Sequence, residues 1–160
     1  LGGKSVQDAI NDEAAIMGEK VELRKVGSLK DAAVDAYMHR TSKDLPPQVG
    51  VLVAYSGSDA DTAHDVAVHI AAFSPSVLKR EDVDADVVAT ERRIAEETAR
   101  NEGKPEAALS KIVEGRVTGF FKENVLLEQD FAKDTKQTVS KVLENAGVTV
   151  SGFLRFRVGA

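Results

Sequence analysis

The residues of this sequence best suited to acid–base or metal chemistry are its three histidines, His39, His64 and His69. Imidazole titrates near neutral pH and is a common metal ligand. The sequence contains no cysteine, and no two histidines have the spacing of a zinc pair. We therefore expect no metal site.

The local sequence around each histidine favours packing or binding over catalysis. On a helix expected at 62–73, His69 lies about 60° from Val66 on the apolar side, which is typical of a buried histidine with a backbone partner. His64 projects to the opposite side, where it would be solvated or would contact another protein. His39 ends a predicted strand beside a long loop, a common place for binding residues.

Acidic residues gather ahead of a predicted helix, at Glu81, Asp82, Asp84 and Asp86. Negative charge at a helix N-terminus complements the helix dipole, and we favour this explanation over paired acid–base catalysis. The sequence has no phosphate-binding loop, dinucleotide-binding glycine motif or nucleophile elbow. We therefore expect a protein that is not an enzyme; a small enzyme using His39 with a carboxylate is the weakest alternative.

The composition of the 160 residues favours a protein partner over nucleic acid or membrane. The net charge is −5, whereas nucleic-acid binding usually needs a basic face. No apolar run approaches the roughly 20 residues that span a membrane. The lack of cysteine fits a cytoplasmic protein. Because the sequence does not start with Met, we expect it to begin partway through a longer protein.

The first third of the sequence predicts one helix followed by strands. Ser5 is a suitable N-cap and Gly18 a suitable stop for a helix at 5–17. Val21 and Leu23 alternate with charged residues, which predicts a half-exposed strand. The expected strands are 20–26, 34–40 and 49–55, and a polar hairpin loop at 41–48 joins the last two.

The rest of the sequence is mostly helical. A helix within 58–75 has two candidate N-caps, Asp59 and Asp61, and ends before Pro75. Two long helices follow at 85–102 and 105–125, and a short helix within 134–147 ends at Gly147. The second long helix has one sustained apolar face, formed by Leu109, Ile112, Val113, Val117, Phe120 and Phe121.

The last segment, 148–158, alternates apolar with polar residues and predicts a strand with one buried face. The expected inward residues are Val148, Val150, Leu154, Phe156 and Val158. The whole pattern predicts an α+β fold, with a small, mostly antiparallel sheet, packed helices and an inserted helical hairpin. A two-helix arm of this kind serves contact with a partner or self-association.

Four segments carry a resemblance to a known family. They are "HIAAFSPSVL" (69–78), "NEGKPEAALSKIVEGRVTGFFKENVLLEQDFAKD" (101–134), "TVSKVLENAGV" (138–148) and "FLRFRVG" (153–159). In this order and spacing the chain resembles bacterial elongation factor Ts over nearly its whole length. In that family the two-helix arm is a coiled coil used for interaction, and in some members for dimerisation.

The resemblance implies a guanine nucleotide exchange factor for elongation factor Tu in cytoplasmic translation elongation. Such a factor binds the nucleotide-free GTPase more tightly, so it must lower nucleotide affinity by the same factor. The implied partner is elongation factor Tu, with no direct nucleic-acid or membrane contact. A homodimer through the arm, or a 2:2 complex, stays open. The alternative is a non-enzymatic interaction or dimerisation module that uses the arm.

The resemblance also implies partner-binding residues. Met17, Gly18 and His39 match positions that face the GTPase domain. His64 and Asp65 match positions near that interface, at which this chain departs from the family's residue types. The segment of Phe131, Ala132 and Lys133 matches the element that meets the third domain of elongation factor Tu.

Finally, the resemblance implies a division of the chain. Residues 1–57 would end the first core subdomain and supply sheet strands, 58–84 and 126–160 would form the second, and 85–125 the inserted coiled-coil arm. The family's N-terminal helical module and its Thr-Asp-Phe motif are not in this sequence. We therefore expect docking on elongation factor Tu with strongly reduced exchange.

Overall fold

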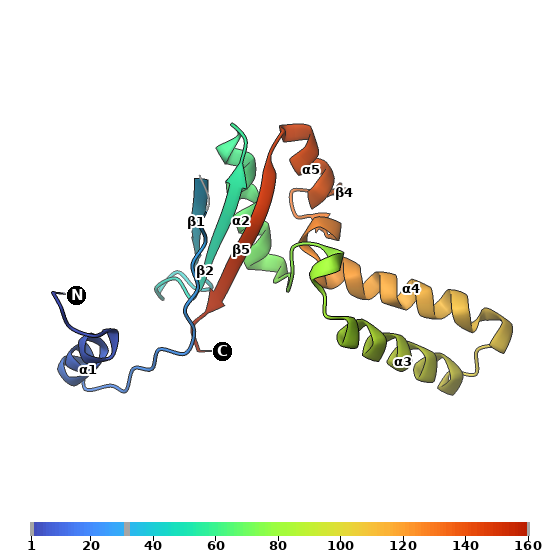
Figure 1. Ribbon diagram of the computed structural model, residues 1–160, viewed down its shortest axis with the longest axis horizontal. Coiled ribbons are helices and arrows are strands. Elements are labelled where there is room, and N and C mark those ends of the chain that lie inside the picture. The colour runs from blue at the N-terminus through green and yellow to red at the C-terminus, as the bar shows by residue number, and fades with distance from the viewer. Residues whose placement is uncertain (1, 31–32, 160) are drawn as a thin grey trace.

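A small antiparallel sheet lies at the centre of the computed structural model, which describes residues 2–30 and 33–159 (Figure 1). Its strand order is β1 (Ala33–His39), β2 (Val49–Ser56), β5 (Thr149–Arg157). The predicted α+β class is confirmed. Strands β1 and β2, which precede the predicted boundary at residue 57, share this sheet with β5. Residues 1, 31, 32 and 160, which belong to the predicted end ranges, lie outside the described residues.

Helix α2 (Ala60–Phe73) packs on one face of the sheet and forms the main core with it. Of the two candidate caps, Asp59 is the one used, since its carboxylate accepts hydrogen bonds from the backbone and the hydroxyl of Thr62, both at 2.9 Å. The core side chains come from β2, α2 and the segment after residue 125. They include Val51, Val53, Val66, Ile70, Leu126, Val139 and Leu143.

Strand β5 does not keep a single inward face, and this part of the strand prediction is wrong. Ala54 pairs with Gly152 but Tyr55 pairs with Val150, so Ser151 is an extra residue that forms a β-bulge. Val150 therefore faces α2, as predicted, whereas Leu154 and Phe156 face the other side of the sheet. Side chains along a strand alternate between the two faces of the sheet. One extra residue therefore moves every later side chain to the opposite face.

Beyond the bulge, Phe153, Arg155 and Arg157 lie on the α2 face of the sheet. Phe153 pairs with Val53 and packs against the core. Arg155 pairs with Val51 and donates from Nη2 to the carbonyl of Ala71 at the end of α2, at 3.2 Å. Val158, also predicted inward, is 77% exposed.

The first helix was placed correctly by the sequence, but the strand expected after it does not form. Helix α1 (Val6–Met17) has Ser5 as N-cap and Gly18, at φ 72°, as C-cap. Residues 20–26 run extended between α1 and β1, with Val21 and Leu23 41% and 53% exposed. A strand needs a neighbouring backbone for its hydrogen bonds, and no strand within the described ranges pairs with this segment.

Helices α3 (Ala85–Asn101) and α4 (Glu106–Asn124) lie side by side and extend away from the sheet (Figure 1). Pro105 is the N-cap of α4. Ala95 of α3 and Val113, Val117 and Phe121 of α4 form a second core with Val125. Ion pairs join the helices across their surface, from Arg92 to Glu114 and from Arg116 to Glu102. Such exposed pairs contribute little to stability, so the apolar contacts hold the helices together.

The two ends of this helical pair meet at its base. The backbone N–H of Ser76 donates to Asn124, and that of Leu126 donates to Val77, at 2.8 and 2.9 Å. The guanidinium of Arg80, in the short helix η1 (Arg80–Asp82), makes two hydrogen bonds with Glu128 of η2 (Leu126–Glu128). Its Cζ also lies 4.2 Å from the ring centre of Phe121. The base of the arm is therefore fixed by backbone, charge and ring contacts.

The short helix predicted within 134–147 begins later than expected. Residues 134–138 form β4 (Asp134–Thr138), which pairs with β3 (Asp130–Phe131). Thr138 then caps α5 (Val139–Ala146) by accepting from Lys141, and Gly147 ends it at φ 63° as predicted. Helix propensity alone predicted that the helix would include residues 134–138, but these residues form a strand because they pair with β3.

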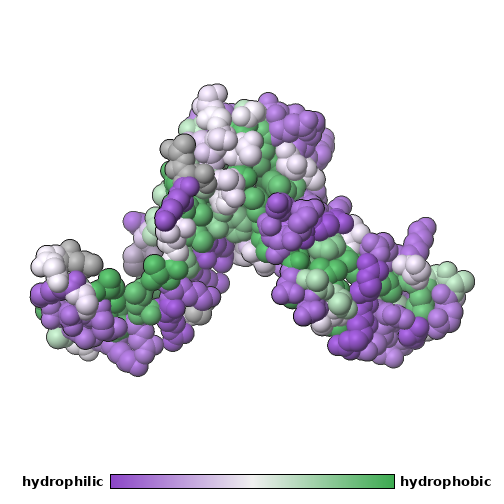
Figure 2. All heavy atoms as spheres, in the orientation of Figure 1, coloured by the Kyte–Doolittle hydropathy of each residue, from purple (hydrophilic) through white to green (hydrophobic). Residues whose placement is uncertain are grey.

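On the face seen in Figure 2, hydrophobic residues are visible over the sheet, between the arm helices and between α1 and the sheet, and hydrophilic residues cover much of α1 and of the arm. Within the described residues, no helix is long and apolar enough to cross a membrane.

Gly57 is the glycine on which this fold depends most. Its φ is 117°, and a Cβ would lie 2.6 Å from the carbonyl oxygen of Gly147. We expect Gly57→Ala to lower the free energy of unfolding by about 2 kcal/mol or more, because the substitution adds backbone strain and a backbone clash. The measurement is urea unfolding followed by circular dichroism.

The matched control is Gly115→Ala, in the interior of α4, where a Cβ would meet no heavy atom within 4 Å. That substitution should raise the free energy of unfolding by about 0.5–1 kcal/mol, since alanine favours a helix over glycine. Equal effects of the two substitutions would contradict the proposed contact between residues 57 and 147.

Candidate protein-interaction site

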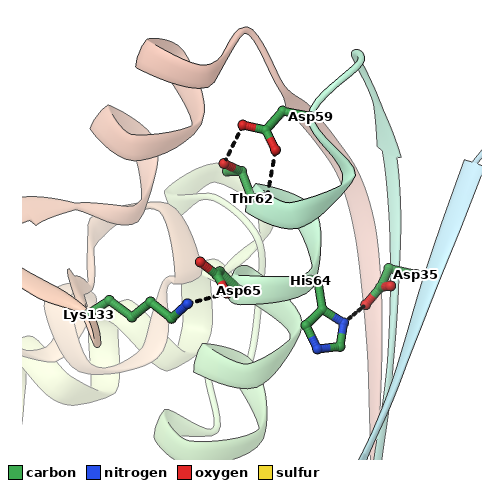
Figure 3. A network of polar contacts seen from close by, with 6 residues as sticks. All are labelled: Asp35, Asp59, Thr62, His64, Asp65 and Lys133. Carbon is green, nitrogen blue, oxygen red and sulfur yellow. Dashed lines mark hydrogen bonds and ion pairs between the residues drawn. The ribbon is translucent and has the colours of Figure 1, made fainter.

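Six of the eight predicted binding residues are brought together by α2, β1 and the β3–β4 turn. On α2, Asp65 forms an ion pair with Lys133, with 2.6 Å between Oδ1 and Nζ (Figure 3). Nδ1 of the neighbouring His64 lies 3.1 Å from Oδ2 of Asp35 on β1. These side chains are exposed or half-buried. The three elements therefore present one continuous polar surface, on which His64 and Asp65 are central.

Tyr37 connects His39 to this surface. Alternation along β1 directs Asp35, Tyr37 and His39 to the side of the sheet that packs on α2. The Tyr37 hydroxyl lies 3.0 Å from Nδ1 of His39, and its ring meets that of His64 edge-on with 5.5 Å between centres. His39 and His64 thus both lie next to the Tyr37 ring.

His69 is fully buried beneath this surface and joins α2 to the chain after the arm. The backbone N–H of Ala132 donates to Nδ1 of His69 at 3.2 Å. Nε2 must then carry the proton, and it donates to Oε1 of Gln129 at 2.8 Å. The Gln129 amide is itself oriented by donating to the carbonyl of Glu123. The prediction of a packed histidine with a backbone partner is confirmed.

Burial lowers the pKa of His69 below its ordinary value, while the hydrogen bond to Gln129 acts in the opposite direction and is weaker. The geometry agrees with a neutral ring, since protonation at Nδ1 would break the bond to Ala132. The imidazole also stacks on Phe73, with 4.7 Å between ring centres. His69 is therefore a fixed structural support of the 131–133 segment.

The other members of that segment differ in exposure. Phe131 is 5% exposed and belongs to the core, so its side chain supports the turn from below. Ala132 and Lys133 are exposed. A partner that approaches α2 would meet these two residues beside Asp65.

Met17 and Gly18 lie elsewhere, at the end of α1. Met17 is 56% exposed, and Gly18 adopts the left-handed conformation that ends the helix. The extended segment 20–26 separates them from β1 in sequence, and Figure 1 shows α1 away from the sheet. The structure therefore does not bring these two residues together with the other six.

Three residues of the site were not singled out from the sequence. Asp35 and Tyr37 hold the histidines, and their signal was present, because a strand at 34–40 places residues 35, 37 and 39 on one side. Gln129 carried no such signal, since its role depends on a histidine 60 positions earlier in the chain.

Exposed ion pairs and half-buried histidines are suited to recognising a protein surface. Within the described ranges, no three His, Asp or Glu side chains are grouped so as to hold a metal ion.

Comparison with known proteins identifies the family. A family model described as elongation factor TS matches residues 1–160. The chain belongs to the elongation factor Ts family. The elongation factor Ts of Clavibacter michiganensis is 62% identical over 99% of this chain, and that of Micrococcus luteus is 61% identical over 98%. The chain spans 58% of the length of each of these two relatives.

The buried His69 should make stability depend on pH. The folded state disfavours its protonation, so stability is full above the ordinary histidine pKa near 6.5 and falls as the unfolded chain takes up the proton below it. We expect the free energy of unfolding to decrease between pH 7 and 5, with His69 contributing at most about 1.4 kcal/mol per pH unit. Urea unfolding at several pH values measures this slope.

The His69→Gln variant should show a shallower pH dependence than the wild type. An unchanged slope in His69→Gln would mean that His69 binds its proton equally well in the folded and unfolded states.

At pH 7.5, His69→Ala should lower the free energy of unfolding by about 2–4 kcal/mol, because it leaves a cavity and an unpaired Gln129.

Proposed function

We propose that this chain docks on elongation factor Tu and takes part in guanine nucleotide exchange during translation elongation in the cytoplasm. Membership of the elongation factor Ts family supports the proposal. The observation that carries it is the surface formed by β1, α2 and the β3–β4 turn, where five of the residues matched to the family's interface gather above the buried Phe131. No chemical step is required of the chain, so it is not an enzyme and needs no cofactor.

The mechanism is a thermodynamic linkage between two ligands of the GTPase. A factor that binds nucleotide-free elongation factor Tu more tightly than the GDP-bound form must weaken GDP binding by the same ratio. In our proposal His39, Met17 and Gly18 face the GTPase domain, with His64 and Asp65 beside that contact. Ala132 and Lys133 meet the third domain, positioned by Phe131 and His69.

A rigid docking surface suits this role. Any ordering of loops on binding would subtract from the affinity for the GTPase. The bond from Ala132 to His69 and the ion pair from Lys133 to Asp65 hold the turn before a partner arrives. The surface is therefore pre-organised for binding.

We further propose that α3 and α4, residues 85–125, are a coiled-coil interaction arm inserted into a second core subdomain of residues 58–84 and 126–160, and that residues 1–57 end the first. A second function, dimerisation through the arm, has one supporting observation. Val87 and Ile94 of α3 are each 44% exposed, and a hollow of about 140 Å³ beside Ile94 lies between the helices. A homodimer or a 2:2 complex would cover them.

Stopped-flow release of a fluorescent GDP from elongation factor Tu tests the exchange proposal. We expect the chain to bind the GTPase, as seen in a pull-down, and to accelerate release much less than a full-length elongation factor Ts does. Acceleration equal to that of the full-length factor would contradict the expected dependence on the family's N-terminal elements. Absence of binding would contradict the proposed partner.

A charge reversal tests the surface. We expect Lys133→Glu to weaken binding about tenfold, because it breaks the pair with Asp65 and reverses a contact charge. The control is Lys141→Glu, at an exposed lysine of α5 that also pairs with a carboxylate. Equal losses in both variants would point to overall charge instead of this surface. Analytical ultracentrifugation at several concentrations separately measures self-association.

A further inference from the structure

A cationic groove lies at the open edge of the sheet, away from the surface described above. It has a volume of about 750 Å³ and is formed between the extended segment after α1 and the end of β5. Lys20, Arg24, Lys25, Arg155 and Arg157 line it together with one carboxylate, Glu22, and with Phe156, Val158 and Gly159. Five cationic residues thus line one groove in a chain whose net charge is −5.

Most of this positive charge is not neutralised within the chain. Glu22 pairs with Lys20 at 2.5 Å and reaches Arg24 at 3.7 Å. In the described structure Lys25, Arg155 and Arg157 have no carboxylate within ion-pair distance. Arg155 is held at one end by the Ala71 carbonyl, while its Nε is buried without a hydrogen-bond partner. The groove therefore favours a ligand that carries several negative charges.

The backbone of β5 is also unpaired at the groove. Strand β5 is an outer strand of the sheet, and the N–H of Val158 donates to Gln48 beside β2 at 2.8 Å. Hydrogen bonding alternates along an antiparallel strand, so the N–H and C=O groups of Arg155 and Arg157 point away from β2. None of the described residues hydrogen-bonds to these outward groups. An edge of this kind pairs readily with another extended chain.

The two faces of β5 differ in chemistry at this edge. Arg155 lies on the α2 face, as its pairing with Val51 shows, and Arg157 follows two residues later on the same face. Phe156, 37% exposed, lies on the opposite face. A strand added here would thus meet guanidinium groups on one face and an aromatic ring on the other. Its own side chains would have to alternate between acidic and apolar.

We propose that this groove binds an extended peptide of alternating acidic and apolar residues, which adds to β5 as a fourth strand. Main-chain hydrogen bonds to Arg155 and Arg157 give the peptide its register, and its carboxylates pair with the cationic side chains. Segment 20–25 forms the other wall, with Val21 and Leu23 exposed. Isolated anions such as phosphate match the cations but leave the outward backbone groups of β5 unpaired.

The test is fluorescence anisotropy of a labelled peptide of eight residues, alternating Glu and Val, titrated with the 160-residue chain. We expect saturable binding that weakens with salt and is absent for the matching Lys–Val peptide. Arg157→Glu and Lys25→Glu should each weaken binding at least tenfold. Lys111→Glu, at an exposed lysine of α4 that pairs with no carboxylate of the described residues, makes the same charge change outside the groove and should leave binding unchanged.

Strand addition is distinguished from simple charge attraction by the peptide backbone. A Glu–Val peptide N-methylated at its four central residues keeps its charge but loses those N–H donors, and we expect it to bind at least tenfold more weakly. Binding of the unmodified peptide should also slow amide hydrogen exchange at Arg155 and Arg157. If the methylated peptide bound with the same affinity as the unmodified peptide, the proposal would be overturned in favour of a simple anion site. Full displacement of both peptides by tripolyphosphate would overturn it in the same way. Lack of any binding would overturn it as well.

Discussion

One buried imidazole holds the two parts of the chain that flank the helical arm. His69 on α2 is bonded to Gln129 and to the backbone of Ala132, across about 60 intervening residues that include the whole arm. The ring has no exposed surface, so both nitrogens need partners, and Gln129 and the backbone of Ala132 supply them. The position of the β3–β4 turn, and with it the polar surface on α2, follows from this requirement.

The base of the arm adds a second constraint next to the first. Glu128 is bonded to Arg80, which lowers the pKa of the Glu128 carboxyl, and Gln129 follows it directly. The chain leaving the arm is thus held on one side by the guanidinium of Arg80 and on the other by the imidazole of His69. The arm and the polar surface on α2 consequently share one junction.

The sequence by itself determined the local elements whose signals are local. Caps and stops placed α1 between Ser5 and Gly18, and α2 and the arm helices within a few residues of their observed ends. The α+β class, the buried state of His69 and the family also followed from residue pattern and motif. These inferences succeed because helix geometry, helix capping and side-chain polarity act between residues that are near one another in the chain.

Only the tertiary structure decided features that depend on a distant backbone. The alternation of residues 20–26 predicted a strand, but no strand of the described chain pairs with this segment. Because of the bulge at Ser151, Leu154 and Phe156 face away from α2. Residues 134–138, predicted as helix, form a strand because they pair with β3. Gln129 acquired its role through His69. A strand's register and a buried polar group's partner are set by residues far apart in sequence, so no local pattern records them.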